Sequence, residues 1–296
     1  MLGVGEGSVK QFTSPDDLHL DPASAVIAVN VFGNEGDELE VNGVVFLGDQ
    51  TNDTDVGLAE QGDVSVSTFA ANQIPDWAFA PEFTGGQGNS ASNLAEVMES
   101  IRWNGAPNPV SIEIEGLVPG VPYEIQLLFD EGRDRVRMWD ITVEDELVVD
   151  NITSAGNFPD DFWDADNSAV YTGEFPGPAD GTLNIEMAQD LGGESPEGDN
   201  NPILQGIIVH VGDTTDTDED GMPDLYEEAN GLDPEVNDAD GDKDEDGISN
   251  LEEFENGTKP NSDDTDGDGL KDGVENGSGT FVSNEMTGTS PTWSFS

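Results

Sequence analysis

This chain of 296 residues contains no cysteine, only eight lysines and arginines, and two histidines. Without cysteine no disulfide framework supports the fold, which leaves bound metal as the remaining candidate cross-link. The scarcity of bases excludes nucleic acid as a partner, because there is no basic patch to displace phosphate counterions. His19 and His210 offer little as the base of a serine nucleophile. No carboxylate pair stands out among the 65 acids as a glycosidase pair. We therefore expect no enzyme.

Long apolar segments are also missing. The first residues, MLGVGEGSVKQFTSPDD, contain no apolar stretch of the 7 to 15 or so residues that a signal peptide needs. No run approaches the roughly 18 apolar residues of a membrane span. We expect no membrane insertion, and no secretion signal is visible in this chain.

Acidic residues are abundant instead, and the formal net charge is −57. From Asp213 onwards the sequence has 26 acids against three lysines. In this segment the acids recur three times in one pattern, which runs from Asp216 to Glu227, from Asp242 to Glu253 and from Asp264 to Glu275. Each copy has Asp at positions 1, 3 and 5, Gly at 6, Asp or Asn at 9 and Glu at 12, the signature of an EF-hand calcium loop.

Calcium chemistry explains this spacing, because Ca²⁺ takes six to eight oxygen ligands and a short loop supplies them only by folding around the ion. The glycine at position 6 allows the sharp turn that this folding needs. Position 7 contributes its backbone carbonyl, position 9 often acts through water, and Glu at 12 closes the shell with both oxygens. The pattern therefore predicts at least three Ca²⁺ ions with these ligands: Asp216, Asp218, Asp220, Met222, Asp224 and Glu227; Asp242, Asp244, Asp246, Ile248, Asn250 and Glu253; Asp264, Asp266, Asp268, Leu270, Asp272 and Glu275.

An acidic, solvated tail is the alternative interpretation of this segment, since blocks of like charge are usually disordered. Chance acidity does not place Gly at 6 and Glu at 12 three times in succession, which favours the metal loops. Without metal the carboxylates should repel one another and keep the tail open, so that metal binding and ordering are one event. Such coupled sites suit the roughly 10⁻⁴ to 10⁻³ M affinities of extracellular modules.

The loops differ from true EF-hands in their spacing. Successive loops start 26 and 22 residues apart, which leaves no room for two helices and a linker of average length. The segment DTDGDGLKDGVENGSGT from Asp264, with GLDP and GTKP after the earlier loops, resembles bacterial thrombospondin type 3 repeats. That resemblance covers residues 213–296 and implies calcium loops joined by a turn of helix in a stiff extracellular stalk. Lys259 stands where the family more often has Asp. Because the family commonly continues with another acidic loop, we interpret both ends as cut from a longer secreted polypeptide.

The first 212 residues predict β-strands, because short β-branched runs alternate with Gly, Pro, Asn and Asp clusters. One helix is expected over 92–101, where Leu94, Val97, Met98 and Ile101 have helical spacing. The predicted strands cover 25–32, 39–47, 64–69, 110–114, 123–129, 136–143, 147–150, 182–187 and 203–211.

Four segments of this region, AVIAVNVFG, IEIEGLVPGVPYEIQLLF, RMWDITVEDELVVDN and NPILQGIIVHVG, resemble malectin-like and galactose-binding-like jelly rolls. The resemblance covers residues 22–212 and implies a β-sandwich of the carbohydrate-binding-module type. We therefore expect an all-β protein with three parts: an N-terminal extension (1–21), a jelly-roll β-sandwich (22–212) and an irregular array of calcium loops with short helical turns (213–296).

A sugar-binding sandwich needs exposed aromatic faces, and loops on a rigid scaffold commonly carry them. Trp77, Trp163 and Tyr171 lie in loop-like stretches and are candidate ligand-binding residues, although each aromatic residue can equally fill an end of the sandwich. Arg133 and Arg135 alternate along one stretch and either grip an anionic glycan or pair with acids on neighbouring strands. Trp139, by its parity with Ile141, is expected in the core.

Together these patterns predict an extracellular or cell-surface protein in which a β-sandwich binds a glycan or another surface component and is carried on a Ca²⁺-stiffened stalk. The alternative is a structural, self-associating filament or surface-layer subunit, and a fragment of a polysaccharide-degrading enzyme is a more distant one. The ligand and the oligomeric state are left open by the sequence.

Overall fold

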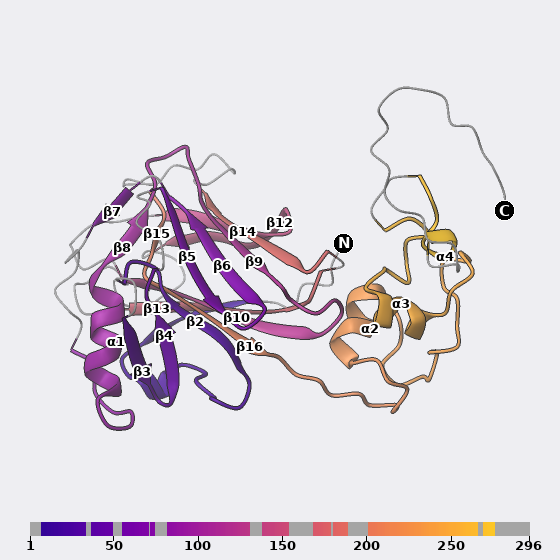
Figure 1. The fold of residues 1–296 in the computed structure, drawn as a ribbon, viewed down its shortest axis with the longest axis horizontal. Coiled ribbons are helices and arrows are strands. Elements are labelled where there is room, and N and C mark those ends of the chain that lie inside the picture. Colours follow the sequence, from indigo (N-terminus) through magenta and orange to yellow (C-terminus); the bar gives the residue numbers. More distant parts are fainter. Residues whose placement is uncertain are drawn as a thin grey trace.

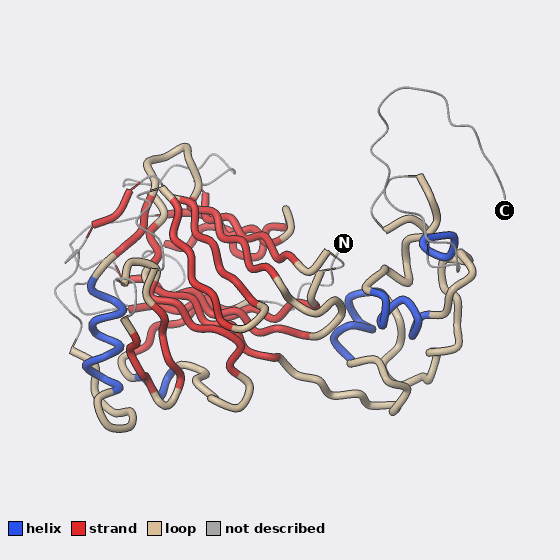
Figure 2. The backbone as a smooth tube through the Cα atoms, in the orientation of Figure 1, coloured by secondary structure: helices blue, strands red, loops and turns tan. Residues whose placement is uncertain are grey.

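The computed structural model describes residues 7–33, 37–49, 55–70, 72–74, 82–130, 138–153, 168–178, 180–188, 201–265 and 269–275. Two large β-sheets pack as a sandwich, and a tail of loops and short helices follows them (Figures 1 and 2). The prediction of a mostly β fold is confirmed. Within the described residues, no helix combines the length and apolarity needed to cross a membrane.

The first sheet has seven strands in the order β1-β13-β10-β16-β2-β4-β3. Its neighbouring strands run antiparallel except β2 and β4, which are parallel. Their bounds are β1 Ser8–Phe12, β2 Ala25–Asn30, β3 Glu38–Val41, β4 Val44–Leu47, β10 Pro122–Asp130, β13 Ser168–Pro176 and β16 Gly206–Val211.

The second sheet has six antiparallel strands in the order β12-β11-β14-β9-β6-β5. A third, three-stranded sheet has the order β15-β8-β7. The bounds are β5 Val56–Gln61, β6 Val64–Phe69, β9 Val110–Glu115, β11 Met138–Val143, β12 Glu146–Thr153 and β14 Thr182–Ala188 in the second sheet, and β7 Asn72–Ile74, β8 Ile101–Trp103 and β15 Ile203–Leu204 in the third.

The main core lies between the two large sheets, where alternate residues of each strand point inward. On β10, Ile125, Leu127 and Phe129 are buried here. Trp139 is fully buried and meets Phe129 edge to face at 5.5 Å, which confirms its predicted core position. Burial of this kind contributes roughly 25 cal/mol per Å² of apolar surface, so the inward rows dominate the stability of the sandwich.

A second apolar cluster covers the outer face of the seven-stranded sheet. Helix α1 (Ser90–Glu99) buries Leu94, Val97 and Met98 there, next to Leu128 and Ile208 of the sheet. A short 3₁₀ helix, Pro15–Asp17, completes the cover. The predicted apolar stripe was therefore correct for three residues, but the helix ends at Glu99 and the next apolar residue of the stripe begins β8.

Three sequence predictions need correction. The expected strand over 39–47 is a hairpin, because Asn42 and Gly43 both take positive φ (48° and 87°) and form the tight turn between β3 and β4. The expected strand over 203–211 is broken at Gln205 into β15 and β16. The segment over 1–21, expected as an extension, contributes β1, which pairs with β13 at the sheet edge.

The sandwich has two distinct ends. One end contains Leu117, Pro122 and Pro176, and β16 leads from this end into the tail. At the opposite end, the register pairs Asp130 with Ser168 and Met138 with Thr153. The connections after β10, β12 and β14 therefore all leave from the end that lies away from the tail.

Candidate metal centres

The first acidic loop closes around its own aspartates. Asp216 accepts hydrogen bonds from the backbone N–H groups of Asp220 (3.2 Å) and Gly221 (2.9 Å). Asp218 accepts from the N–H of Asp220 at 3.1 Å, and Asp220 accepts from the N–H of Met222 at 3.0 Å. These bonds bring carboxylate oxygens of Asp216, Asp218 and Asp220 within 4.8 Å of one another.

The second loop repeats this geometry bond for bond. Asp242 accepts from the N–H groups of Asp246 (3.1 Å) and Gly247 (3.1 Å), and Asp244 accepts from the N–H of Asp246 at 3.1 Å. Asp246 in turn accepts from the N–H of Ile248 at 2.9 Å. The carboxylates of Asp242, Asp244 and Asp246 again lie within 4.8 Å. The repeated sequence pattern therefore gives a repeated local structure.

In the third loop the N–H of Gly269 donates to the carboxylate of Asp264 at 2.9 Å, as the position-6 glycines of the first two loops do. Asp266 and Asp268 lie outside the described residues. All three position-6 glycines take the expected left-handed backbone, with φ of 101° at Gly221, 108° at Gly247 and 96° at Gly269. A side chain is strained in this region, which is why glycine is needed at the turn.

A short helix begins at position 9 of each loop. These are α2 (Asp224–Asn230), α3 (Asn250–Asn256) and α4 (Asp272–Glu275). Gly231 and Gly257 end the first two helices in the left-handed conformation (φ 68° and 77°), so neither helix can continue. The loops therefore follow one another at short intervals.

The position-9 residues make a hydrogen bond that the sequence pattern did not predict. Asp224 accepts from the N–H of Thr217 at 2.7 Å, Asn250 from that of Lys243 at 3.2 Å, and Asp272 from that of Thr265 at 3.0 Å. In each loop the side chain at position 9 thus holds the backbone N–H of position 2 and closes the loop. Contact with an ion through water stays a prediction for these three residues.

The position-12 glutamates carry the clearest electrostatic feature. Glu227 and Glu253 are fully buried, and neither carboxylate has a hydrogen-bond partner among the described residues. Burial, together with the Asp218 charge, raises the pKa of Glu227 to about 8. Burial and the Asp244 charge likewise raise the pKa of Glu253 to about 8. An uncompensated buried carboxylate is costly, and a divalent cation in the loop removes that cost. The side chain of Glu275 lies outside the described part of the chain.

Asp238 is a candidate ligand that the sequence pattern missed. Its carboxylate lies within 4.8 Å of those of Asp220 and Glu227. Asp220 holds this segment, because its second oxygen accepts the N–H groups of Asp238 (3.2 Å) and Ala239 (3.0 Å). Asp238 stands between two loops, outside either twelve-residue pattern. The only sequence signal for it is that it begins the alternating acids that lead to Asp242.

The donor set of these loops fits Ca²⁺. The clustered side-chain atoms are all carboxylate oxygens, the ligands that hard divalent cations prefer, and no nitrogen or sulfur donor joins the described clusters. Met222 is fully buried beside Tyr226 and Ala239, so its side chain anchors the loop while its carbonyl stays a predicted ligand. The carbonyls of Ile248 and Leu270 stay predictions in the same way.

The candidate ligand-binding residues of the sandwich divide into two groups. Tyr171 does not lie in a loop: it belongs to β13 and is fully buried in the main core, so its prediction as a surface binding residue was wrong. The run SAVYTGEFP forms a nine-residue strand that pairs along its length with β10. Trp77, Trp163, Arg133 and Arg135 lie outside the described residues.

Three of these candidates follow described strands in the sequence. Arg133 and Arg135 follow β10, whose last residue is Asp130, and Trp163 follows β12, whose last residue is Thr153. Asp130 pairs with Ser168 and Thr153 with Met138, so both of these strands end at the end of the sandwich away from the tail.

Comparisons with known proteins add similarity at a low level. No protein-family model matches the chain, and no curated protein matches it. Among solved structures, the plant receptor-like kinase ANX2 matches 64% of this chain and 49% of its own, with 13% identity and a TM-score of 0.44. The ANX1 ectodomain from Arabidopsis thaliana gives 11% identity over 64% of this chain and 49% of its own, with a TM-score of 0.43. A Bacteroides uniformis beta-glucuronidase gives 16% identity over 63% of this chain and 18% of its own, with a TM-score of 0.35.

The matched region thus spans about half of each plant chain and less than a fifth of the glucuronidase. TM-scores below one half carry no argument about function. The functional interpretation therefore depends on the residues of this chain.

Proposed function

We propose that this chain is an extracellular calcium-binding protein in which a β-sandwich of the jelly-roll type binds a glycan or another surface component and the acidic tail is a Ca²⁺-stiffened spacer. The observation that carries the calcium part is the full burial of Glu227 and Glu253, whose carboxylates have no hydrogen-bond partner among the described residues. Each closes a loop whose three aspartates already converge. The resemblance of residues 213–296 to thrombospondin type 3 repeats supports the same assignment.

Charge explains why the ion would stiffen the tail. The first loop gathers Asp216, Asp218, Asp220 and Glu227, and Asp238 approaches from the next segment. Four or five negative charges in such a space repel one another strongly unless a cation lies among them. Binding of Ca²⁺ therefore orders the loop, and the bonds from Asp220 to Asp238 and Ala239 pass this order to the next loop.

The binding part rests on the sandwich end away from the tail. Strands β10 and β12 end there, and Arg133, Arg135 and Trp163 follow these strands in the sequence. Loops on rigid strands commonly bind ligands. A binding surface at this end and a spacer at the other place the ligand site at the tip of a stalk. An extracellular location is favoured because Ca²⁺ is abundant outside cells and sites of this kind are weak.

A calcium titration and a glycan array test the proposal. Calcium added to the chelated full chain should bind with a Kd of roughly 10⁻⁴ to 10⁻³ M and should increase the order of the tail. A glycan array, read with and without EDTA, should give hits with the unchanged chain. Trp163→Ala, which leaves the core residue Trp139 in place, should remove these hits. Absence of calcium binding would refute the spacer, and absence of any glycan hit would favour the self-associating alternative.

A further inference from the structure

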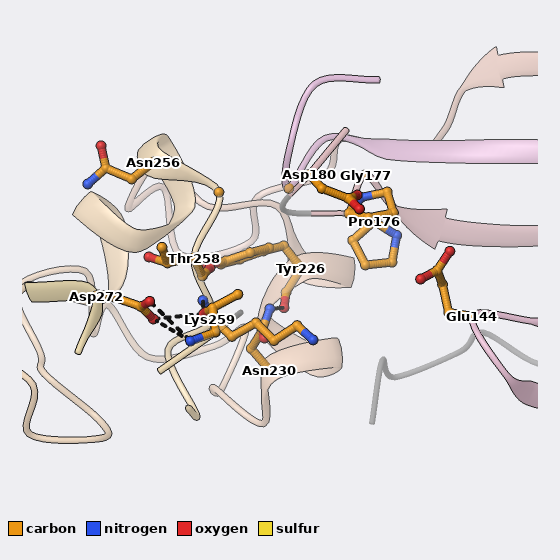
Figure 3. Close-up of a pocket in the computed structure, with 14 residues that line it drawn as sticks. Glu144, Pro176, Gly177, Asp180, Tyr226, Asn230, Asn256, Thr258, Lys259 and Asp272 are labelled. Carbon is orange, nitrogen blue, oxygen red and sulfur yellow. Dashed lines mark hydrogen bonds between the residues drawn. The ribbon is translucent and has the colours of Figure 1, made fainter. Parts of the chain in front are cut away.

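A cavity of about 550 Å³ lies where the sandwich meets the tail (Figure 3). The two parts enclose it together: Glu144, Pro176 and Asp180 line it from the sandwich, and Tyr226, Thr258 and Lys259 line it from the tail. We propose that this cavity is a carbohydrate-binding site for a small oligosaccharide, and that it is complete only when the first two loops hold Ca²⁺. The second half of this proposal rests on the calcium binding proposed above.

The joint that forms the cavity is closely packed. Tyr226 and Phe254, from α2 and α3, meet edge to face with their ring centres 4.8 Å apart. Gly120, in a turn of the sandwich, lies against them. A Cβ atom at this position would stand 2.5 Å from Cδ2 of Phe254 and 2.6 Å from its Cε2, and φ is +75°. Only glycine fits this contact without strain, so the tail is seated against the sandwich in one arrangement.

The sandwich side of the cavity presents acceptors that are held in place. Glu144 Oε1 accepts from the backbone N–H of Asn184 at 2.6 Å and from its side-chain amide at 3.2 Å. Asp180 Oδ1 accepts from the N–H of Thr182 at 2.9 Å. Among the described residues the second oxygen of each carboxylate has no hydrogen-bond partner. Fixed carboxylates of this kind are good acceptors for hydroxyl groups.

The tail side presents the Lys259 side chain as a donor. The backbone N–H of Lys259 donates to Thr265 Oγ1 at 2.8 Å, and that hydroxyl donates to Asp272 at 2.7 Å. The backbone is thereby fixed while the lysine side chain extends from the tail toward the sandwich (Figure 3). Within the described part of the chain its ammonium has no ion-pair partner. Thr258 adds a buried hydroxyl oxygen that lacks a partner in the same part.

Acceptors on one wall and a donor on the other suit a ligand with many hydroxyl groups, each of which can donate and accept. A small anion is disfavoured because Glu144, Asp180 and Asp272 face the same space, and a lone cation is disfavoured by Lys259. The volume lies within the roughly 300 to 1,000 Å³ of small-molecule sites.

Calcium binding affects the cavity through the two aromatic residues at the contact between the sandwich and the tail. Tyr226 directly precedes Glu227, and Phe254 directly follows Glu253. Each position-12 glutamate therefore fixes the helical turn that seats one aromatic ring against the sandwich. If Ca²⁺ at the loops favours the closed joint, a sugar in the cavity must raise the calcium affinity by the same factor by which calcium raises the sugar affinity.

The test uses the full chain on an array of neutral and uronic acid di- to tetrasaccharides, in millimolar Ca²⁺ and in EDTA. The strongest hit then serves as the probe in titration calorimetry. Lys259→Gln should weaken its binding about ten- to hundredfold, because a charged hydrogen bond is lost. Gly120→Val should weaken it comparably by unseating the tail. Lys10→Gln removes the same charge from an exposed position on β1 and should leave the affinity unchanged.

The outcomes separate the two proposals. A hit that needs Ca²⁺ and Lys259 supports the cavity site, and its probe should in turn tighten calcium binding. A hit that is insensitive to Lys259→Gln and Gly120→Val overturns the cavity site and points to the opposite end of the sandwich. No hit at all, with calcium binding intact, overturns the cavity site and the glycan-binding part of the proposed function, and leaves the calcium-binding part in place. Loss of calcium binding itself would overturn the proposed function as well.

Discussion

Replacing Glu227 with glutamine should have opposite effects with and without calcium. Glu227 is buried, no described residue forms a hydrogen bond with its carboxylate, and its pKa is raised from 4.5 to about 8. Because the folded-state pKa lies above the unfolded one, the contribution of this group to stability is fully present below pH 4.5 and is lost as the pH rises toward 8. At pH 7 the metal-free loop must therefore either hold a proton or open.

The size of this effect follows from the same two pKa values. Holding the proton at pH 7, 2.5 units above the unfolded pKa of 4.5, costs at most about 3 kcal/mol at ~1.4 kcal/mol per unit. Glutamine has the same shape and no charge, so Glu227→Gln should stabilise the metal-free first loop by up to this amount. The same change removes a bidentate ligand and should weaken calcium binding at this loop by at least about tenfold.

Urea unfolding of the chelated chain, followed through the NMR signals of the Gly221 and Met222 amides, measures the first effect, and a calcium titration measures the second. Glu228→Gln is the matched control, because Glu228 is the next residue, carries the same charge and is exposed. It should change neither quantity by more than about 0.5 kcal/mol. If Glu227→Gln destabilises the metal-free loop as well, the assignment of Glu227 as a calcium ligand held ready in a buried site is wrong.

Three further predictions concern the sandwich. Burial, and then the charge of the stacked His19, lower the pKa of His210, so the stability of the sandwich should fall as the pH drops below 6.5. In tryptophan-monitored unfolding, the stability of His210→Phe should depend less on pH between 7 and 5. An identical pH profile for the variant would contradict this. Asp49→Ala removes the carboxylate that forms an ion pair with the fully buried Arg102. It should cost about 3 to 5 kcal/mol in urea unfolding, against little change for the exposed Asp63→Ala. A loss under about 1 kcal/mol would show that the pair is dispensable. Trp139→Ala should cost about 3 to 5 kcal/mol in the same assay, because it empties the space beside Phe129, and a near-neutral result would mean that the two sheets repack.

Local patterns predicted the regular strands well, because alternation and turn residues decide them. Strand β6 has the predicted bounds, Val64–Phe69, and β14 extends its prediction by one residue. The hairpin at Asn42 and Gly43 was readable in principle, since this dipeptide is the strongest short signal for a tight turn. It was missed because apolar residues on both sides suggested one continuous strand.

Strand β13 shows where sequence patterns fail. Its residues include Gly173 and follow a loop-like stretch, so Tyr171 looked exposed. Pairing with both β1 and β10 buries it, and that pairing joins segments far apart in the sequence. Long-range contacts of this kind override local preference.

The metal loops were predictable for a physical reason: their ligands lie within twelve consecutive residues, and their turn needs a glycine. Asp238 was not predictable, because it approaches the first loop only after the chain has folded back past α2. The joint at Gly120 depends likewise on contacts between separate parts of the chain. Its only sequence signal is Lys259, which stands where the thrombospondin type 3 family more often has Asp.

The most direct measurement of the central claim is a calcium titration of the chelated full chain followed by ¹⁵N NMR at the amides of Gly221, Gly247 and Gly269. Each of these N–H groups donates to the position-1 aspartate of its loop. If the loops are calcium sites, the three signals should shift together to low field, or first emerge, at roughly 10⁻⁴ to 10⁻³ M Ca²⁺. Signals that stay unchanged at millimolar Ca²⁺ would contradict the account.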